Sequence, residues 1–258
     1  MDVTQAAIEF RNVSYRLPDG RALLDDVSLA VAEGTTVALL GKSGSGKTTL
    51  LRAVNRMHAI TGGEVLVRGR SIAELEPIAL RRSIGYVIQE TGLFPHFSIE
   101  RNIGLVMEIE GQPRAAIQAR AHALLAMVGL EAEEFARRMP TALSGGQRQR
   151  VGLARALAAG QDILLMDEPF GALDPLTRAE MQDVLRRLTT ETRPGGGRTT
   201  VLLVTHDLDE ALYLAERVVL VDEGRIAANL AANEFLHSNV PAVQAYVRAV
   251  HRGTEAQR

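Results

Sequence analysis

A stretch of nine residues, 41–49 with the sequence GKSGSGKTT, constrains the fold of this chain more than any other part of it. The apolar run 37–40 precedes it, and apolar residues at helical spacing follow it, namely Leu50, Leu51, Val54 and Met57. Strand, glycine-rich turn and helix in this order are the context that a phosphate-binding loop needs. A flexible glycine–serine linker, the alternative, requires neither a lysine at position 47 nor the flanking strand. The stretch therefore predicts an α/β core that binds a nucleoside triphosphate.

The residue types in this loop suit the binding of phosphate groups. Glycines let the backbone curl so that successive N–H groups point at phosphate oxygens, and the helix start adds free N–H groups and partial positive charge. We expect Lys47 to reach the β- and γ-phosphates and the Thr48 hydroxyl to ligate Mg²⁺. The expected nucleotide-binding residues of the loop are Gly41, Lys42, Ser43, Gly44, Ser45, Gly46, Lys47, Thr48 and Thr49.

Composition narrows the class of protein. The chain has 258 residues, of which 46% are hydrophobic, and a formal net charge of −2, so nothing points to nucleic acid or to an anionic membrane surface as a partner. The absence of cysteine excludes a disulfide framework and fits a reducing cytosol. We expect no signal peptide and no membrane span, because no basic segment with an apolar core and no apolar run of sufficient length occurs. If the chain serves a membrane, we expect it to act from the water side.

The order of hydrophobic patterns predicts one domain with an inserted helical part. Residues 8–15 and 27–31 alternate as an antiparallel pair of strands, and further strands are expected at 64–67 and 84–89. Residues 163–166 and 201–204 are expected to form buried strands. Residues 217–228 read as strand, turn and strand, and a helix follows near the C-terminus. Between the strands at 84–89 and 163–166, five apolar residues recur at helical spacing and predict one apolar stripe, namely Ile117, Ala121, Leu124, Leu125 and Val128. We predict a single domain over 1–258: an α/β core with its antiparallel part at 1–90 and 156–235, a helical subdomain at 91–155, and a C-terminal helix and tail at 236–258.

Polar side chains follow three of the predicted strands. Because ligands gather at the carboxyl ends of parallel strands, we expect Asp167 to hold the Mg²⁺ shell and Glu168 to accept a proton from the attacking water. Gln89 is expected to ligate Mg²⁺ and to hydrogen-bond the attacking water, and His206 is expected to hydrogen-bond the γ-phosphate. An acidic pair that stands alone after a strand is more often a helix cap or a turn, and a lone histidine at a strand end is usually structural. Capping-box spacing of Asp207 and Glu210 explains a helix start but leaves His206 unexplained.

A second anion site is predicted at residues 143–147, LSGGQ, which open a helix. Ser144 and Gln147 have the spacing of a capping box. A cap does not account for Gly145 and Gly146, because glycine is unfavourable in the first turn. We therefore expect a group to approach these helix N–H groups closely, and an anion supplied by another subunit would fit.

Together these motifs resemble a known family. Residues 41–49 (Walker A), Gln89 (Q-loop), 143–147 (signature), 163–168 (Walker B), 171–174 (D-loop) and His206 (switch histidine) occur in the order seen in the ATP-binding subunits of ABC transporters. The resemblance covers nearly the whole chain. It implies a P-loop, RecA-like parallel-sheet core with an antiparallel β subdomain and an inserted α-helical subdomain, the ABC ATPase fold.

The resemblance also implies function. ATP with Mg²⁺ is expected between Walker A of one copy and Ser144, Gly145, Gly146, Gln147 and the D-loop Asp174 of a second copy. The two copies are expected to form a head-to-tail homodimer. Tyr15 matches the aromatic residue that stacks on adenine. The implied partners are integral-membrane permease subunits, docked after Gln89, and indirectly a substrate-binding protein. The implied location is peripheral, at the cytoplasmic face of the bacterial inner membrane.

Within the family, residues 80–82, 84–96 and 170–175 are similar to the glycine betaine/proline/choline importers. Gly171 departs from the serine frequent in D-loops. Many osmoprotectant ATPases continue into paired CBS domains, whereas this chain stops at Arg258, so we expect none. The alternatives are an importer ATPase for another small solute, an exporter, a non-hydrolysing regulatory module, and a soluble ABC-type ATPase acting on nucleic acid or the ribosome. The last usually carries coiled-coil insertions, zinc-binding cysteines or basic arms, which the sequence lacks.

Overall fold

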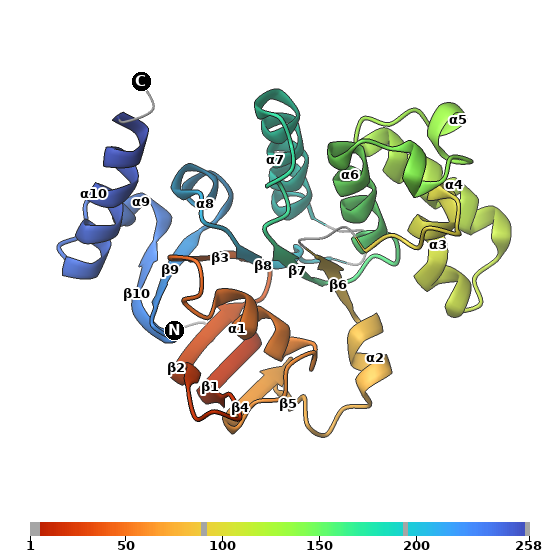
Figure 1. Cartoon of the computed structure of the whole chain (residues 1–258). Helices are drawn as coiled ribbons and strands as arrows, with labels where there is room; N and C mark the ends of the chain where they lie inside the picture. The colour runs from red at the N-terminus through yellow and green to blue at the C-terminus, as the bar shows by residue number, and fades with distance from the viewer. Residues whose placement is uncertain (1–5, 89–91, 193–195, 256–258) are drawn as a thin grey trace.

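The computed structural model describes residues 6–88, 92–192 and 196–255, the last four of these by their backbone alone. Two sheets organise it (Figure 1): a four-stranded sheet in the order β2-β1-β4-β5 and a six-stranded sheet in the order β10-β9-β3-β8-β7-β6. The first sheet comprises β1 (Ala6–Arg16), β2 (Ala22–Ala32), β4 (Gly62–Val67) and β5 (Arg70–Ser71). The second comprises β3 (Thr36–Leu40), β6 (Ile84–Val87), β7 (Ile163–Asp167), β8 (Thr200–Val204), β9 (Arg217–Asp222) and β10 (Arg225–Ala231).

The six-stranded sheet is parallel from β6 to β9, and β10 is antiparallel to β9. Strands β3, β7 and β8 are buried along their whole length, as continuous apolar runs in a parallel sheet should be. Since their carboxyl ends meet at one edge, the polar residues that follow them are brought to the same side of the molecule.

The four-stranded sheet is antiparallel, with Phe10 opposite Leu29 and Tyr15 opposite Leu24. Its apolar face packs on helix α1 (Lys47–Val54) in a core that also takes residues from the parallel sheet. Met57, which the helical spacing predicted on the apolar side of that helix, is wrongly assigned. It lies beyond the end of α1 and is 53% exposed.

Helices α3 (Ile99–Ile109), α4 (Arg114–Met127), α5 (Ala132–Phe135) and α6 (Gly145–Ala156) form the helical part, which lies to one side of the parallel sheet in Figure 1. Ala121, Leu124 and Leu125 of the predicted stripe are buried on α4. Gly104 on α3 permits a close approach, because a Cβ there would lie 2.3 Å from the Ile117 Cγ2. The predicted strands and helical part are confirmed, and the domain boundaries stay a prediction.

The remaining helices are α2 (Pro77–Arg82), α7 (Pro175–Thr190), α8 (Leu208–Leu214), α9 (Ala232–Phe235) and α10 (Pro241–Glu255). The short elements α2, α5, α9 and β5 were not expected, because two to six residues are too few for a hydrophobic period to register. Helices α8 and α10 share a third apolar cluster with β9 and β10. Within the described ranges, no helix is both long and apolar enough to cross a membrane.

Candidate functional site

The predicted phosphate loop connects β3 to α1, and its glycines are required by both backbone and space. Gly41, Gly44 and Gly46 have φ values of 150°, 78° and 105°. A Cβ on Gly41 would lie 2.2 Å from the Val221 carbonyl oxygen, and one on Gly46 would lie 2.6 Å from that of Leu23. Gly44, in contrast, faces open space. The loop therefore packs closely against β9 at Gly41 and against β2 at Gly46, and it is open at Gly44.

Lys47 lies inside this loop with only 6% of its surface exposed. Its Nζ donates to the carbonyl oxygens of Gly41 (2.8 Å) and Lys42 (2.7 Å). Burial lowers the pKa of the Lys47 ammonium, and the nearby carboxylates of Glu168 and Asp167 oppose that shift. The loop thus holds a desolvated cation next to free helix N–H groups, which is a favourable environment for a multiply charged anion.

Asp167 is fully buried at the end of β7 and contacts two side chains of α1. The Thr48 hydroxyl donates to Asp167 Oδ1 at 2.8 Å, and Arg52 Nη2 lies 3.3 Å from Asp167 Oδ2. Burial raises the pKa of Asp167, while these two partners oppose the shift. Arg52 was missed by sequence reasoning, although it follows Thr48 by four positions and so shares its helix face.

The donor set suits Mg²⁺. The paired Thr48 hydroxyl and Asp167 carboxylate offer the hard oxygen ligands that this ion takes, and Mg²⁺ usually completes its shell with phosphate oxygens and water. Among the residues that the structure describes, no three His, Cys, Asp or Glu side chains gather as a protein-only metal site. A nucleotide would therefore have to share in holding the ion. Gln89, the third predicted ligand, lies outside the described residues.

Glu168 turns out of the sheet directly after Asp167 with a left-handed backbone, φ 47°. Its N–H donates to the Val204 carbonyl oxygen (3.0 Å), and its own carbonyl accepts from Gln149 Nε2 (3.2 Å). The carboxylate Oε1 lies 3.4 Å from the Nδ1 of His206. The structure thus brings the predicted base and the predicted switch histidine together. Gln149, whose Oε1 also accepts from the Ala172 N–H at 3.0 Å, was not predicted.

The predicted capping box at the start of α6 is confirmed. The Ser144 N–H donates to Gln147 Oε1 (2.9 Å), and the Gln147 N–H donates to Ser144 Oγ (3.2 Å). A Cβ on Gly145 would meet nothing within 4 Å, so this position leaves the helix start open. A Cβ on Gly146 would lie 3.2 Å from the Leu173 Cδ2, so the D-loop supplies part of the close approach expected there.

Asp174 has a local role in addition to the one that the resemblance implies. It caps α7 by accepting from the Thr177 N–H (3.1 Å), and its hydrogen bonds with Thr177 lower its pKa. Asp207 caps α8 by accepting from the Glu210 N–H (3.1 Å), so the helix start that the spacing explained is present. The Asp207 N–H donates to Thr205 Oγ1 (3.0 Å) and not to the Glu210 side chain. The Glu210 carboxylate is instead buried and accepts from Gln182 Nε2 on α7 (3.2 Å).

Tyr15 lies near the end of β1, opposite Leu24. Its ring is tilted by 39° against that of His58, with 5.7 Å between the ring centroids. The Leu24 Cδ2 lies 3.1 Å from the position of a Cβ on Gly46, so the strand paired with β1 abuts the phosphate loop. The adenine-stacking role of Tyr15 stays a prediction.

Comparisons with known proteins agree with this geometry. The profile of a family described as ABC transporter matches residues 24–171. The osmoprotectant import ATP-binding protein OsmV of Salmonella typhimurium is 45% identical over 217 residues, covering 83% of this chain and 54% of the relative. The glycine betaine uptake system ATP-binding protein YehX of Escherichia coli is 47% identical over 219 residues, covering 85% and 69%.

A solved structure of the ATP-binding cassette MJ0796, a dimer in a post-hydrolysis state bound to ADP and Pi, superposes with a TM-score of 0.80 at 33% identity. The match covers 87% of this chain and 98% of that one, and it confirms the predicted fold class. The chain spans little more than half the length of OsmV. With its family profile, its relatives and its fold in agreement, the chain belongs to the ABC transporter family.

Proposed function

We propose that this chain is the ATP-binding subunit of a bacterial ABC importer and that it hydrolyses ATP in the presence of Mg²⁺. The observation that carries the proposal is the convergence of a buried lysine, a hydroxyl–carboxylate pair and a carboxylate–imidazole pair at the carboxyl edge of one parallel sheet. These are Lys47, the pair Thr48 and Asp167, and the pair Glu168 and His206. Membership in the family supports the choice of ATP.

Each side chain has a task that follows from its position. Lys47 and the N–H groups at the start of α1 bind the phosphates, and Thr48 and Asp167 hold Mg²⁺ with Gln89 as a further ligand. The ion supplies neutralisation of phosphate charge when it is bound. Glu168 accepts the proton of the attacking water at its carboxylate. His206, 3.4 Å from that carboxylate, keeps base and water aligned.

We further propose that two copies pair head to tail, so that Ser144, Gly145, Gly146 and Gln147 of one copy complete the phosphate site of the other together with Asp174. The open space beside Gly145 supports a close approach there, and the cassette MJ0796 is described as dimeric. ATP-driven closure of the dimer would drive permease subunits at the cytoplasmic face of the membrane. We keep the division into 1–90 with 156–235, 91–155 and 236–258 as part of this proposal.

The cargo we propose is an osmoprotectant of the glycine betaine, proline or choline type, delivered through a substrate-binding protein. The names of OsmV and YehX support this class. Uptake of labelled glycine betaine, choline, carnitine and proline into vesicles that hold the permease with this subunit tests the proposal. Transport of a different small solute would overturn the proposal of an osmoprotectant cargo. Copurification with nucleic acid instead of a permease would overturn the proposed transport function.

The ATPase part is tested by replacing the proposed base. Glu168→Gln should lower ATP turnover by about 10²- to 10⁴-fold, the usual contribution of a general base, while ATP binding persists. Lys47→Ala should lose ATP affinity, because Lys47 is the buried cation of the loop, whereas Lys42 is exposed. Glu180→Gln, on the exposed face of α7, is the matched control and should keep full turnover. Full activity of Glu168→Gln would remove this residue as the base.

A further inference from the structure

The turn between β9 and β10 lies between the phosphate loop and strand β2. The Gly224 N–H donates to the Ser45 carbonyl oxygen (2.9 Å), and the Gly224 carbonyl accepts from the Asp25 N–H (2.9 Å). The fit is tight, since a Cβ on Gly224 would lie 2.7 Å from the Leu23 carbonyl oxygen. One glycine of this turn therefore bonds both to the loop expected to hold phosphates and to the antiparallel sheet.

Charged side chains strengthen the same junction from the outside. Arg225 donates from Nε to Asp25 Oδ2 at 3.0 Å and contacts that oxygen again through Nη2. Arg16 Nη2 lies 3.7 Å from Asp25 Oδ1. We call Arg16, Asp25 and Arg225 the Asp25 ion cluster. Its carboxylate is 28% exposed and its two guanidinium side chains are 56% and 70% exposed, so the cluster lies at the surface and joins segments 200 positions apart.

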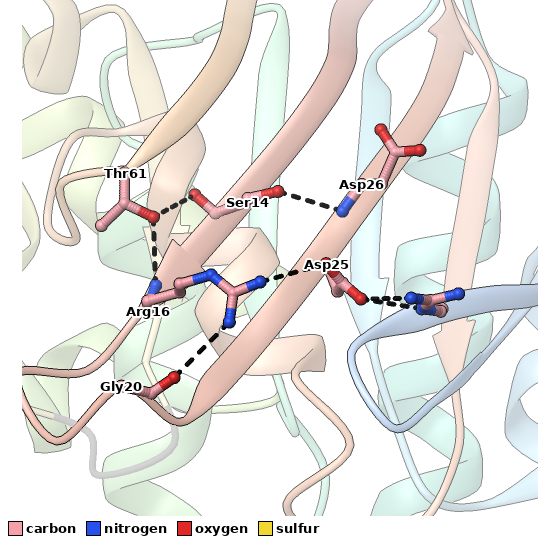
Figure 2. Close-up of polar contacts among 7 residues, drawn as sticks. Ser14, Arg16, Gly20, Asp25, Asp26 and Thr61 are labelled. Atoms are coloured by element: carbon pink, nitrogen blue, oxygen red, sulfur yellow. Dashed lines mark hydrogen bonds and ion pairs between the residues drawn. The ribbon is translucent and has the colours of Figure 1, made fainter.

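The Asp25 ion cluster is also connected to the backbone of Ser14 and Arg16 through Thr61, as Figure 2 shows, and these two residues flank Tyr15 in the sequence. The Thr61 hydroxyl accepts from the Arg16 N–H (3.1 Å) and donates to the Ser14 carbonyl oxygen (3.1 Å). Ser14 Oγ accepts from the Asp26 N–H at 3.1 Å. Contacts therefore run without interruption from the neighbours of Tyr15 through Asp25 to the turn that bonds the phosphate loop.

We propose that the Asp25 ion cluster is a positioning element that sets the distance between Tyr15 and the phosphate loop. The inference rests on the proposed function, in which the loop binds the triphosphate and Tyr15 the adenine. The distance between the adenine and the phosphates of a nucleotide is limited by its covalent structure. A nucleotide therefore contacts both Tyr15 and the phosphate loop only if these two parts of the site are held at a matching separation. Breaking the cluster leaves the Gly224 backbone bonds intact. The loss of affinity should therefore concern the contacts with the nucleoside and leave the contacts with the phosphates unchanged.

The test compares two ligands, Mg-ATP and Mg-tripolyphosphate, which share the phosphates and differ in the nucleoside. Affinities of the full chain are measured by calorimetry for wild type, Arg225→Gln and Asp25→Asn. We expect each variant to raise the Kd for Mg-ATP about threefold to fivefold, the upper range for exposed ion pairs, and to leave the Kd for Mg-tripolyphosphate unchanged. Arg11→Gln is the matched control, because Arg11 also pairs with a carboxylate on the same sheet, that of Glu9 on its own strand.

A double-mutant cycle separates positioning from a general structural role. If Arg225 acts through Tyr15, Arg225→Gln should have no further effect on Mg-ATP affinity in a Tyr15→Ala background. Additive effects, an equal loss for both ligands, or a loss no larger than that of Arg11→Gln would each overturn the inference. A wild-type chain that binds neither ligand would overturn the proposed function itself, so the two failures are distinguishable.

Discussion

Glu168 combines a left-handed backbone with a side chain at the centre of the candidate site. Its φ of 47° is held by the bond from its N–H to Val204 and by the bond from Gln149 to its carbonyl. A residue with a Cβ in this region costs about 1–2 kcal/mol, and asparagine tolerates the region better than most residues. Glutamine and asparagine both replace the carboxylate by a neutral amide. We therefore expect Glu168→Asn to be more stable than Glu168→Gln by about 0.5–1 kcal/mol.

Thermal unfolding without added nucleotide measures this difference, because a ligand would shift the midpoint by its own binding. For a chain of this size we expect the Asn variant to unfold about 1–3 °C above the Gln variant. Both should show the same large loss of ATP turnover, because both lack the carboxylate, so stability and activity are read separately. The same pair of substitutions at Glu180 is the control. There, on the exposed face of α7, glutamine is the better helix former and the order should reverse. A Gln variant at position 168 as stable as the Asn variant would refute the claim of backbone strain.

Two other substitutions test packing and buried charge. Gly104→Ala should lower the free energy of unfolding by about 1 kcal/mol, because overpacking against Ile117 outweighs the gain in helix propensity. Denaturant titration measures the loss, which Ile117→Ala should reduce in the double variant. Glu210→Gln should stabilise the protein more at pH 8 than at pH 4.5. Burial raises the pKa of Glu210 above its ordinary 4.5, so the contribution of Glu210 to wild-type stability falls as the pH rises from the ordinary pKa through the raised one, and glutamine lacks this loss. A constant difference in unfolding midpoint across this pH range would contradict the reasoning.

Features that depend on neighbours in sequence were predictable. Ser144 and Gln147 form their capping box because both partners lie in one helical turn, and no distant residue of the described ranges competes for them. The phosphate loop likewise followed from a strand, a turn and a helix in direct succession. The edge of the sheet at which Glu168 contacts His206 was predictable because parallel strands share a direction.

Features that depend on distant partners were not predictable from spacing. Asp207 and Glu210 have the same spacing as Ser144 and Gln147, yet the buried Glu210 carboxylate accepts from the half-buried Gln182 of α7 instead. Arg52 could have been placed on the face of Thr48, but its partner Asp167 lies 115 positions further on. Where the local sequence pattern allows several hydrogen-bond partners, contacts with residues distant in the sequence therefore decide which one is used.

The phosphate loop itself shows how far a local motif depends on remote backbone. A side chain at Gly41 would meet the carbonyl of Val221, and one at Gly46 would meet that of Leu23, and both are main-chain atoms that cannot rotate aside. Ser45 is bonded by Gly224 from the same turn region. The glycines are thus required by the packing of β2 and β9 around the loop as much as by left-handed φ angles. In this chain the local motif therefore predicts the loop, and the positions of β2 and β9 explain why Gly41 and Gly46 admit no side chain.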